Sequence, residues 1–462
     1  MNDLSRRPLD AVPFRVTNPE RIPTPRYYDE AFFELERERL WPHVWQMACR
    51  LEEIPEVGDW VEYKNLDKSV IVVRTKSGVK AFHNACRHRG VQLVSGRGEC
   101  EVQGFTCPFH GWRWNIDGQN TFVLGRHLFS EENLAAAEIN LVPCRVELWG
   151  GCAFINHDDE APSLREGMAP MAERLEARNV DKLSMEWWFA TVLPTNWKLA
   201  MEAFMEGYHT LRTHPQLLTP LGVDESAISS GAPTSLAERV ATSREYTDRM
   251  VQYLRILSDG MAGQVHGSEV DIAETLVDME MPQDRKAWEG AFYSRLKDEI
   301  HQQGRARGVP VPDLNKVDAT YPFTPVEFLF PHYFLLPTFS AFASYRIRPL
   351  TPETCIFELY SLILRPEGEA YERVREPTWL AYDSKEYPQI PQQDYSNLPL
   401  QQLGLHAKGF EFMRLSRTVE GLISNYQRLI DGYLAGLDQD RLVKASQSVN
   451  GSFNVPIADI GL

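Results

Sequence analysis

Apolar and polar residues alternate in several short stretches near the start of the chain. The stretches WVEYK (60–64), SVIVVR (69–74) and VKAFHN (79–84) repeat every second residue, and TKSG separates the last two. Alternation of this kind buries one face of a strand, and a short polar turn joins antiparallel neighbours. CRVELW and CAFIN continue the pattern before the polar stretch HDDEAPS. The pattern predicts one small antiparallel β domain at about 46–160.

The rest of the chain combines strand and helix periodicities. LSMEWWFATVL (183–193) predicts a strand, as do HYFLLPTFSAFASYRIR and CIFELYSLIL, which flank the turn TPET. Residues 216–320 are mostly polar with helical spacing, and an amphipathic helix is predicted from about Lys408 to Leu434. The order of these elements predicts an α+β fold for the second part of the chain.

Capping signals place two further helices. Asp29 is suited to begin a short helix through about Leu40, because its carboxylate can accept free N–H groups of the first turn. Asn196 can cap a helix that runs through WKLAMEAFMEGYHTLRTH to Pro215. The predicted division is an N-terminal helical segment, the β domain, a larger domain with a helical insertion, and a tail: 1–45, 46–160, 161–440 with the insertion 216–320, and 441–462.

Composition narrows the class of protein. With 462 residues, of which 43% are hydrophobic and 24% charged, the chain has the composition of an ordinary soluble globular protein with two or three domains. Its longest apolar stretch, FLFPHYFLLP, contains two prolines and a histidine, so no transmembrane helix is expected. The opening MNDLSRRPLDAVPFRV lacks the apolar core of a secretory signal, which makes the cytoplasm the expected location. The formal charge of −16 argues against nucleic acid as a partner.

Two short clusters contain the side chains of a metal centre. Cys86 and His88 form the first and Cys107 and His110 the second, with eighteen residues between them. A structural zinc site of the Cys2His2 type would use the same ligands. A Rieske [2Fe–2S] centre fits the flanking CRHRG and CPFHGWRW better, because one iron takes both cysteines and the other both histidines. Neutral imidazoles raise the potential of such a cluster into roughly the −150 to +300 mV range, which makes it an easily reduced electron carrier.

The remaining cysteines give no second signal. Seven cysteines without a regular spacing disfavour a disulfide framework. Five of the seven have no partner at ligand spacing and are expected to be ordinary residues: Cys49, Cys100, Cys144, Cys152 and Cys355.

A second constellation lies in NWKLAMEAFMEGYHTLRTH, residues 196–214. On a helix, Glu206 and His209 would share a face, and His214 would follow near the end of that helix. Two His and one carboxylate, bound on one face with open positions, form the ligand set of non-haem Fe(II) oxygenases. Taken alone the His pair is weak evidence, because most such pairs are solvated or satisfied by hydrogen bonds in the core.

Joined to the upstream Rieske motif and to the leading NWK, this segment resembles the iron-binding segment of Rieske non-haem iron oxygenase (aromatic-ring-hydroxylating dioxygenase) α subunits. The resemblance covers nearly the whole chain, from the helix before residue 40 to the last helix near 434. It implies a Rieske [2Fe–2S] β domain followed by a helix-grip (START/Bet v 1-like) catalytic domain, in which a curved antiparallel sheet wraps around long helices.

The resemblance also implies the ligands of a mononuclear iron. His209 and His214 match the two iron histidines of the family. The third ligand would be Asp394 in QQDYSNLPLQQLGL, because the sequence that follows looks like the signature of the family at that place. The competing interpretation is an aspartate of an ordinary turn, with Asp383 and Asp431 as weaker candidates for the ligand.

One position departs from the common pattern. Most relatives have an Asp shortly before the first iron histidine, where this chain has Glu206, and Ala203 stands where many have Asn. Some branches use Glu at this bridging position, so the departure indicates a subfamily. By resemblance the protein is a trimer, alone or with small β subunits (α3β3), in which Glu206 connects His209 to His110 of the partner subunit.

The implied mechanism requires a separate electron donor. NAD(P)H electrons would arrive through a reductase or ferredoxin, because the chain has no GxGxxG loop and no second iron–sulfur motif. They would pass from the cluster to the mononuclear Fe(II), which activates O2 beside the substrate.

The substrate is predicted less directly. HYFLLPTFSAFASY alternates aromatic and small residues, which would suit an apolar cavity for an aromatic or alicyclic compound that is mono- or cis-dihydroxylated; core packing explains the pattern equally well. Arg346 and Arg348 could meet a substrate carboxylate, although solvated edge arginines are commoner.

The alternative within the family is oxidation or dealkylation of a quaternary-ammonium or other N-alkyl substrate. Outside it, the alternative is a Rieske electron-transfer protein without oxygenase chemistry. The insertion 216–320 is a candidate lid or subunit contact.

Overall fold

The computed structural model describes residues 9–100, 104–223, 229–230, 235–261 and 263–462. Parts of the opening stretch, of the segment between the two Cys/His clusters and of the predicted insertion therefore lie outside the described residues. Among those that are described, none of the helices combines the length and the apolar composition that a bilayer crossing requires.

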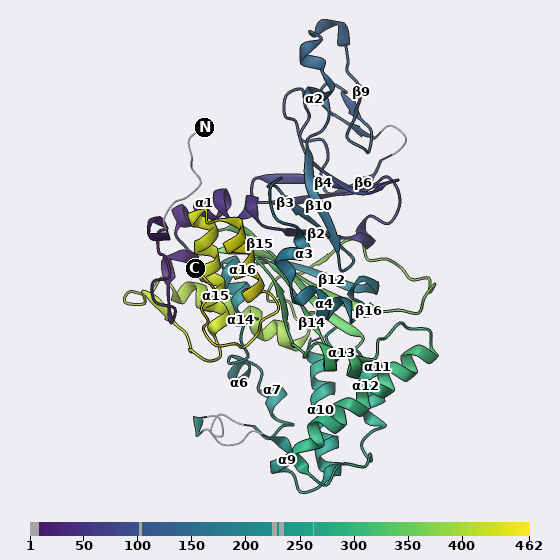
Figure 1. The fold of residues 1–462 in the computed structure, drawn as a ribbon, viewed down its shortest axis with the longest axis vertical. Coiled ribbons are helices and arrows are strands. Elements are labelled where there is room, and N and C mark those ends of the chain that lie inside the picture. The colour runs from purple at the N-terminus through teal and green to yellow at the C-terminus, as the bar shows by residue number, and fades with distance from the viewer. Residues whose placement is uncertain (1–8, 101–103, 224–228, 231–234, 262) are drawn as a thin grey trace.

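The predicted β domain is present as a seven-stranded sheet. Each strand predicted from the alternating pattern is confirmed, and the strand order is β2-β11-β10-β5-β4-β3-β6. The strands are β2 (Gln46–Arg50), β3 (Asp59–Asn65), β4 (Lys68–Thr75), β5 (Gly78–His83), β6 (Arg97–Glu99), β10 (Pro143–Trp149) and β11 (Cys152–Asn156). A smaller sheet of β7 (Phe105–Thr106), β8 (Arg113–Trp114) and β9 (Asn120–Phe122) extends from it and lies at the upper end of Figure 1.

The second domain is built around a six-stranded sheet with the order β13-β14-β15-β16-β12-β17. Its strands are β12 (Leu183–Leu193), β13 (Glu327–Leu329), β14 (Tyr333–Pro337), β15 (Ala341–Thr351), β16 (Thr354–Leu364) and β17 (Thr378–Trp379). Neighbours pair antiparallel except β12 and β17. Helices cover this sheet (Figure 1), so the predicted α+β fold with a curved antiparallel sheet is confirmed.

The helices near the two ends of the chain differ in part from the prediction. Asp29 caps α1 (Glu30–Arg39) as expected, through a bond from the Phe32 N–H to its carboxylate. The prediction of a helix from Lys408 to Leu434 is wrong in its first half. There β18 (Phe412–Arg414) pairs with β1 (Arg21–Pro23), and the helix α15 runs only over Gly421–Ala435. The chain then forms α16 (Gln439–Val449), which the pattern did not predict.

The predicted insertion is helical where it is described. Its helices are α7 (Pro215–Leu218), α9 (Leu236–Arg239), α10 (Ser243–Met261), α11 (Gly267–Glu274), α12 (Trp288–Ala306) and α13 (Leu314–Thr320). They form the green and teal layer at the lower end of Figure 1, on the side of the six-stranded sheet away from the small sheet. Their buried apolar side chains belong to the same core as the six-stranded sheet, so the insertion is packed onto the second domain.

Arg346 joins the two domains. Two of its nitrogens donate to the Glu358 carboxylate at 2.7 Å each, and a third donates to the backbone carbonyl of Ala48 on β2. Arg348 reaches the same carboxylate at 3.3 Å. Because a charge buried in the protein needs a partner of opposite charge, these two arginines serve the structure. The expectation of solvated edge arginines is wrong, and the carboxylate that they meet belongs to the protein.

Candidate functional site: two metal centres

The two Cys/His loops have the same backbone conformation. The Cys86 N–H donates to the Val91 carbonyl at 2.8 Å and the Cys107 N–H to the Trp112 carbonyl at 2.8 Å. Each turn is closed by a glycine four residues after the cysteine, Gly90 and Gly111, which has a positive φ that other residues rarely adopt. This repeated turn explains why glycine follows each cluster in the sequence.

The loops bring the four predicted cluster ligands together. Both thiols are buried, and the rings of His88 and His110 lie with their centroids 4.7 Å apart. The Nδ1 atom of His88 is buried and has no hydrogen-bond partner among the described residues. A buried imidazole nitrogen without a partner is costly unless it binds a ligand, so these residues fit a cluster with one all-Cys and one all-His iron.

Backbone groups around the cysteines suit a reducible cluster. Burial raises the pKa of Cys86, the backbone N–H groups of His88 and Arg89 lower it, and the adjacent Cys107 thiol raises it again. N–H groups that point at a sulfur stabilise its anionic form, and in an iron–sulfur cluster they shift the potential upward.

The predicted helix from Asn196 to Pro215 is interrupted, which is a correction with a local cause. It divides into α5 (Trp197–Glu202), an irregular segment, and α6 (Thr210–Thr213). The C-terminal segment supplies the hydrogen bonds that a helix would have made: the Asn454 N–H donates to the Met205 carbonyl, and the Gly207 N–H donates to the Asn454 side chain. The shared position of Glu206 and His209 therefore comes from a turn before α6.

Residues from two distant parts of the chain converge at this turn. The ligand-forming atoms of His209, His214 and Asp394 all lie within 4.8 Å of one another. The Asp394 Oδ1 atom is 3.0 Å from the Nε2 of His214 and 3.9 Å from the Nε2 of His209. Asp394 lies on the buried side of α14 (Gln389–Gly404), so it is not the turn aspartate of the competing interpretation. Two imidazoles and one carboxylate at this spacing fit a mononuclear iron.

Other side chains orient both imidazoles. The Nδ1 of His209 lies 2.8 Å from the Glu206 Oε1, and the Nδ1 of His214 lies 2.7 Å from the Gln393 Oε1. Holding each Nδ1 in this way directs each Nε2 toward Asp394. Burial alone would lower the pKa of His209, but the Glu206 carboxylate outweighs it and the pKa lies above its usual value. Sequence reasoning missed Gln393, because nothing but its place beside Asp394 distinguishes it from the other glutamines.

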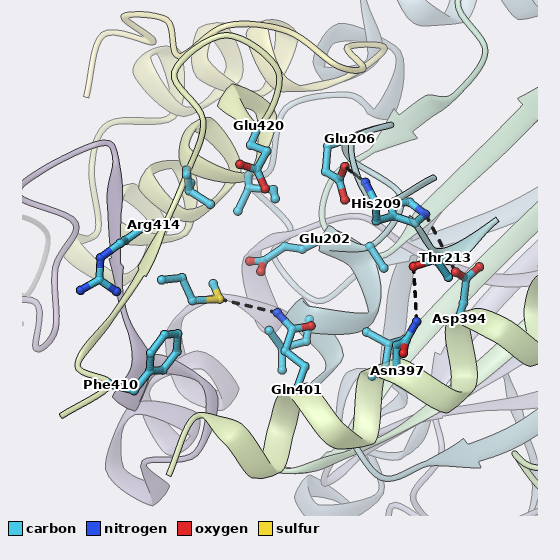
Figure 2. Close-up of a pocket in the computed structure, with 16 residues that line it drawn as sticks. Glu202, Glu206, His209, Thr213, Asp394, Asn397, Gln401, Phe410, Arg414 and Glu420 are labelled. Carbon is cyan, nitrogen blue, oxygen red and sulfur yellow. Dashed lines mark hydrogen bonds and ion pairs between the residues drawn. The ribbon is translucent and has the colours of Figure 1, made fainter. Parts of the chain in front are cut away.

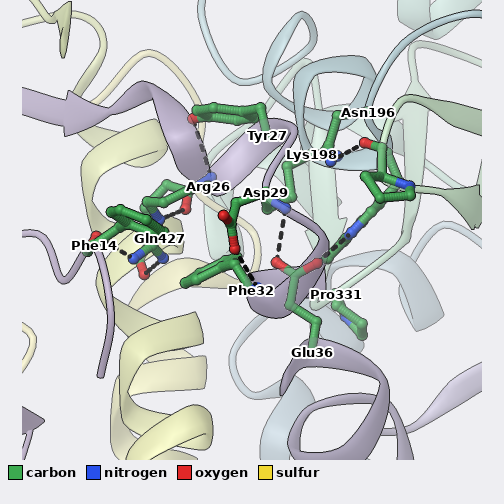
Figure 3. A network of polar contacts seen from close by, with 12 residues as sticks. Phe14, Arg26, Tyr27, Asp29, Phe32, Glu36, Asn196, Lys198, Pro331 and Gln427 are labelled. Carbon is green, nitrogen blue, oxygen red and sulfur yellow. Dashed lines mark hydrogen bonds and ion pairs between the residues drawn. The ribbon is translucent and has the colours of Figure 1, made fainter. Parts of the chain in front are cut away.

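The alternative aspartates lie elsewhere. Asp383 is exposed in a turn after β17. Asp431 is buried on α15, where it pairs with Arg26. Arg26 also donates to the Gln427 side chain at 2.7 Å, within the polar network of Figure 3. Glu202 accepts hydrogen bonds from the Tyr27 hydroxyl at 2.9 and 3.0 Å and from the Gln427 amide. Burial raises the pKa of Glu202 to about 7, although these hydrogen bonds lower it.

A cavity of about 460 Å³ opens beside the triad. Its lining includes His209 and Asp394, three more carboxylates (Glu202, Glu206 and Glu420), one arginine (Arg414) and Phe410. Figure 2 shows the three glutamates around the same space, with Phe410 and Arg414 on the side away from the triad. Burial and the nearby charge of Glu206 raise the pKa of Glu420, against a hydrogen bond from the Ser416 N–H. Carboxyl groups are therefore prominent in the polar lining beside the triad.

The strand residues that were expected to line an apolar cavity do not line this one. Phe334 and Tyr345 are buried and pack on Phe204, with ring centroids 4.8 and 5.0 Å from it. The alternation in HYFLLPTFSAFASY thus reflects the core between the sheet and α5.

Comparison with protein families agrees with both centres. The model of the Rieske [2Fe–2S] domain matches residues 44–123, and that of the ring hydroxylating alpha subunit catalytic domain matches residues 173–436. The cofactors of the chain are accordingly a Rieske [2Fe–2S] cluster and a mononuclear iron.

Individual relatives are similar over part of the chain. The carnitine monooxygenase oxygenase subunit of Acinetobacter baumannii is 32% identical over 202 residues, which are 43% of this chain and 54% of the relative. The glycine betaine monooxygenase oxygenase subunit of Chromohalobacter salexigens is 32% identical over 201 residues, 43% of this chain and 44% of the relative. The chain thus spans about half the length of the curated relatives it matches.

The same fold is found in solved structures. The quaternary ammonium Rieske monooxygenase CntA, in complex with its substrate γ-butyrobetaine, aligns with a TM-score of 0.57 over 93% of this chain and 99% of that chain, at 19% identity. Because the catalytic-domain model alone matches residues 173–436 of 462, more than half of the chain, the protein belongs to the ring-hydroxylating α-subunit family of Rieske oxygenases.

Proposed function

We propose that the protein is the oxygenase component of a multicomponent Rieske oxygenase, and that its substrate carries a quaternary-ammonium or other N-alkylated cation. The observation that carries the choice of substrate is the acidic cavity beside the triad, lined by Glu202, Glu206 and Glu420. The relatives named for carnitine and glycine betaine support the same class. This replaces the aromatic or alicyclic compound as the preferred substrate.

Two sets of residues would bind the two metal centres. When bound, the cluster supplies single electrons and the mononuclear iron activates O2 next to the substrate. Cys86, Cys107, His88 and His110 would hold the cluster. His209, His214 and Asp394 would hold the iron beside the cavity. Glu206 and Gln393 would keep both imidazoles in the tautomer that presents Nε2.

The acidic lining would select the substrate by charge. A quaternary ammonium makes no hydrogen bonds, so it is recognised by negative potential and by the faces of aromatic rings. The glutamates supply the negative potential, and Phe410 supplies an aromatic face. Arg414, on the side of Figure 2 away from the triad, is placed to meet a carboxylate at the other end of a zwitterionic substrate.

The electrons would come from a separate NAD(P)H reductase or ferredoxin, and the chain would act as a homo-oligomer. Within one chain, the small sheet beside the Cys107 loop and the segment around α6 lie far apart (Figure 1). This separation supports transfer between subunits, with the loops of one chain meeting the triad of its neighbour.

Metal content separates an oxygenase from a simple electron carrier. We expect the purified protein to be brown, to hold about three irons per chain, and to show the Rieske electron paramagnetic signal after reduction. Iron and sulfide analysis together with the spectrum measures this. Two irons per chain with full sulfide would support an electron carrier without oxygenase chemistry, and a colourless protein with one zinc would exclude the cluster.

A matched pair of substrates tests the charge. With a reductase that reduces the cluster, we expect carnitine or glycine betaine to be oxidised with a kcat/KM about 10- to 100-fold above that of the neutral analogue in which carbon replaces the quaternary nitrogen. The measurement is product formation coupled to O2 uptake. Glu420→Gln should reduce this preference and leave both metals in place. Equal rates for the cation and the neutral analogue, or a cis-diol from naphthalene with no oxidation of the cations, would contradict the proposal.

A further inference from the structure

Three metal-binding side chains meet in the seven-stranded sheet, and none of them is a ligand of either centre described above. His83 ends β5, Cys144 is the second residue of β10, and His157 directly follows β11. Their strands are neighbours in the sheet, with β10 between β5 and β11. The sequence did not reveal this group, because the three residues are distant in the chain and Cys144 has no partner at ligand spacing.

The group is as compact as the mononuclear iron triad. One ligand atom from each of the three residues lies within 4.8 Å of the others, and this is one of two such groups among the described residues. The two imidazole rings have centroids 5.5 Å apart. The Nδ1 atom of His157 is buried and has no hydrogen-bond partner in the part of the chain that the structure describes. The geometry points to a metal site formed by His83, Cys144 and His157, with Zn²⁺ as its ion.

The donor set favours zinc among the common ions. One thiolate and two imidazoles suit a borderline-soft ion, whereas Mg²⁺ and Ca²⁺ require oxygen ligands. Three protein ligands leave the fourth tetrahedral position for water or for the carboxylate of Asp159, whose charge acts on both His83 and Cys144. Zn–N and Zn–S bonds of about 2.0–2.3 Å require the three side chains to move closer by a small amount.

The protonation states of the free residues agree with this donor set. Burial lowers the pKa of His157 to about 4; the neighbouring His83 and Lys68 lower it further, and Asp67 opposes them. Burial also lowers the pKa of His83, with Asp159 opposing and Lys68 adding. Both imidazoles are therefore neutral near pH 7 and can bind directly. Burial and Asp159 raise the pKa of the Cys144 thiol to about 12, so one proton leaves its sulfur when the Zn–S bond forms.

Such an ion would connect three strand ends. His83 lies three residues before Cys86, so the same strand end leads into the first cluster loop. The ion would fix this strand against β10 and β11 without touching the cluster ligands. The site shares no residue with either iron centre, so the inference does not depend on the proposed function.

Zinc binding to the holoprotein tests the inference. We expect iron-replete protein incubated with Zn²⁺ and passed through a desalting column to retain about one zinc per chain. Its extended X-ray absorption fine structure at the zinc edge should show one sulfur neighbour at about 2.3 Å and imidazole nitrogens at about 2.0 Å. Cys144→Ser should weaken zinc binding by more than about 100-fold. Loss of a group that only hydrogen-bonds a metal ligand typically costs about 10- to 100-fold, and Cys144 would be a ligand itself. His157→Gln should do the same, and both should keep the spectrum of the Rieske cluster.

Two controls separate this site from others. Cys100→Ser removes a different thiol of the same domain, which is partly buried, and should leave zinc binding unchanged. His214→Ala removes the iron triad as a competing zinc site, and it should not reduce the zinc that carries a sulfur neighbour. Zinc bound with oxygen and nitrogen neighbours alone, or equal binding by wild type and Cys144→Ser, would overturn the inference. Because the zinc absorption spectrum is measured on wild-type protein, it tests the inference even if a variant does not fold.

Discussion

Asp394→Ala should lose its mononuclear iron and its turnover while the protein remains brown. Asp394 supplies the single carboxylate of the triad, and its Oδ1 lies 3.0 Å from the Nε2 of His214. Without it, two neutral imidazoles remain, which hold Fe(II) weakly. We expect product formation to fall by at least about 1000-fold and iron to fall from about three to about two per chain. His214→Ala should give the same result. Iron analysis, the Rieske spectrum and product formation are the three measurements.

Asp383→Ala is the matched control for the loss of a carboxylate. Asp383 is exposed in a turn outside the triad, so iron content and turnover should stay at the wild-type level. Full iron and activity in Asp394→Ala would contradict the assignment, and the third ligand would then have to come from another carboxylate near the cavity.

Glu206→Gln should slow electron transfer by orders of magnitude while both metal centres stay in place. Glu206 accepts the His209 backbone N–H at 2.9 Å with one oxygen and faces the ring Nδ1 at 2.8 Å with the other. It also lines the open cavity. In the proposed oligomer it would accept a hydrogen bond from His110 of the partner subunit. Glutamine keeps the size of the side chain but removes the charge and one acceptor oxygen. We therefore expect at least about 100-fold slower cluster reoxidation and almost no product.

Single-turnover kinetics with pre-reduced protein measure this step directly. Normal cluster spectra and near-normal mononuclear iron would distinguish a defect in transfer from the loss of a centre. Glu202→Gln is the comparison, because Glu202 lines the same cavity but is held by Tyr27 and Gln427. Unchanged reoxidation in Glu206→Gln would exclude it as the bridge, and slow reoxidation in Glu202→Gln would transfer that role to Glu202.

Local patterns were sufficient for the longer strands and for naming the four expected cluster ligands. β12 was predicted with its observed bounds, Leu183–Leu193, because both faces of the strand carry strongly apolar residues between clear turn signals. Cys86, His88, Cys107 and His110 could be named because each pair lies within one short turn, so its spacing is visible in the sequence. The resemblance to a known family, rather than the spacing, identified Asp394.

Other features depend on contacts between distant segments, and the sequence did not predict them. The interruption between α5 and α6 follows from Asn454, which takes over hydrogen bonds that a continuous helix would have made. Gln393 meets His214 because α14 packs beside that interruption. His83, Cys144 and His157 form a group because β5, β10 and β11 are neighbours in one sheet. The sequence by itself determined the elements, whose signals lie within a few residues. Which side chains meet was decided by the tertiary structure, since packing and buried hydrogen bonds join residues without regard to their distance along the chain.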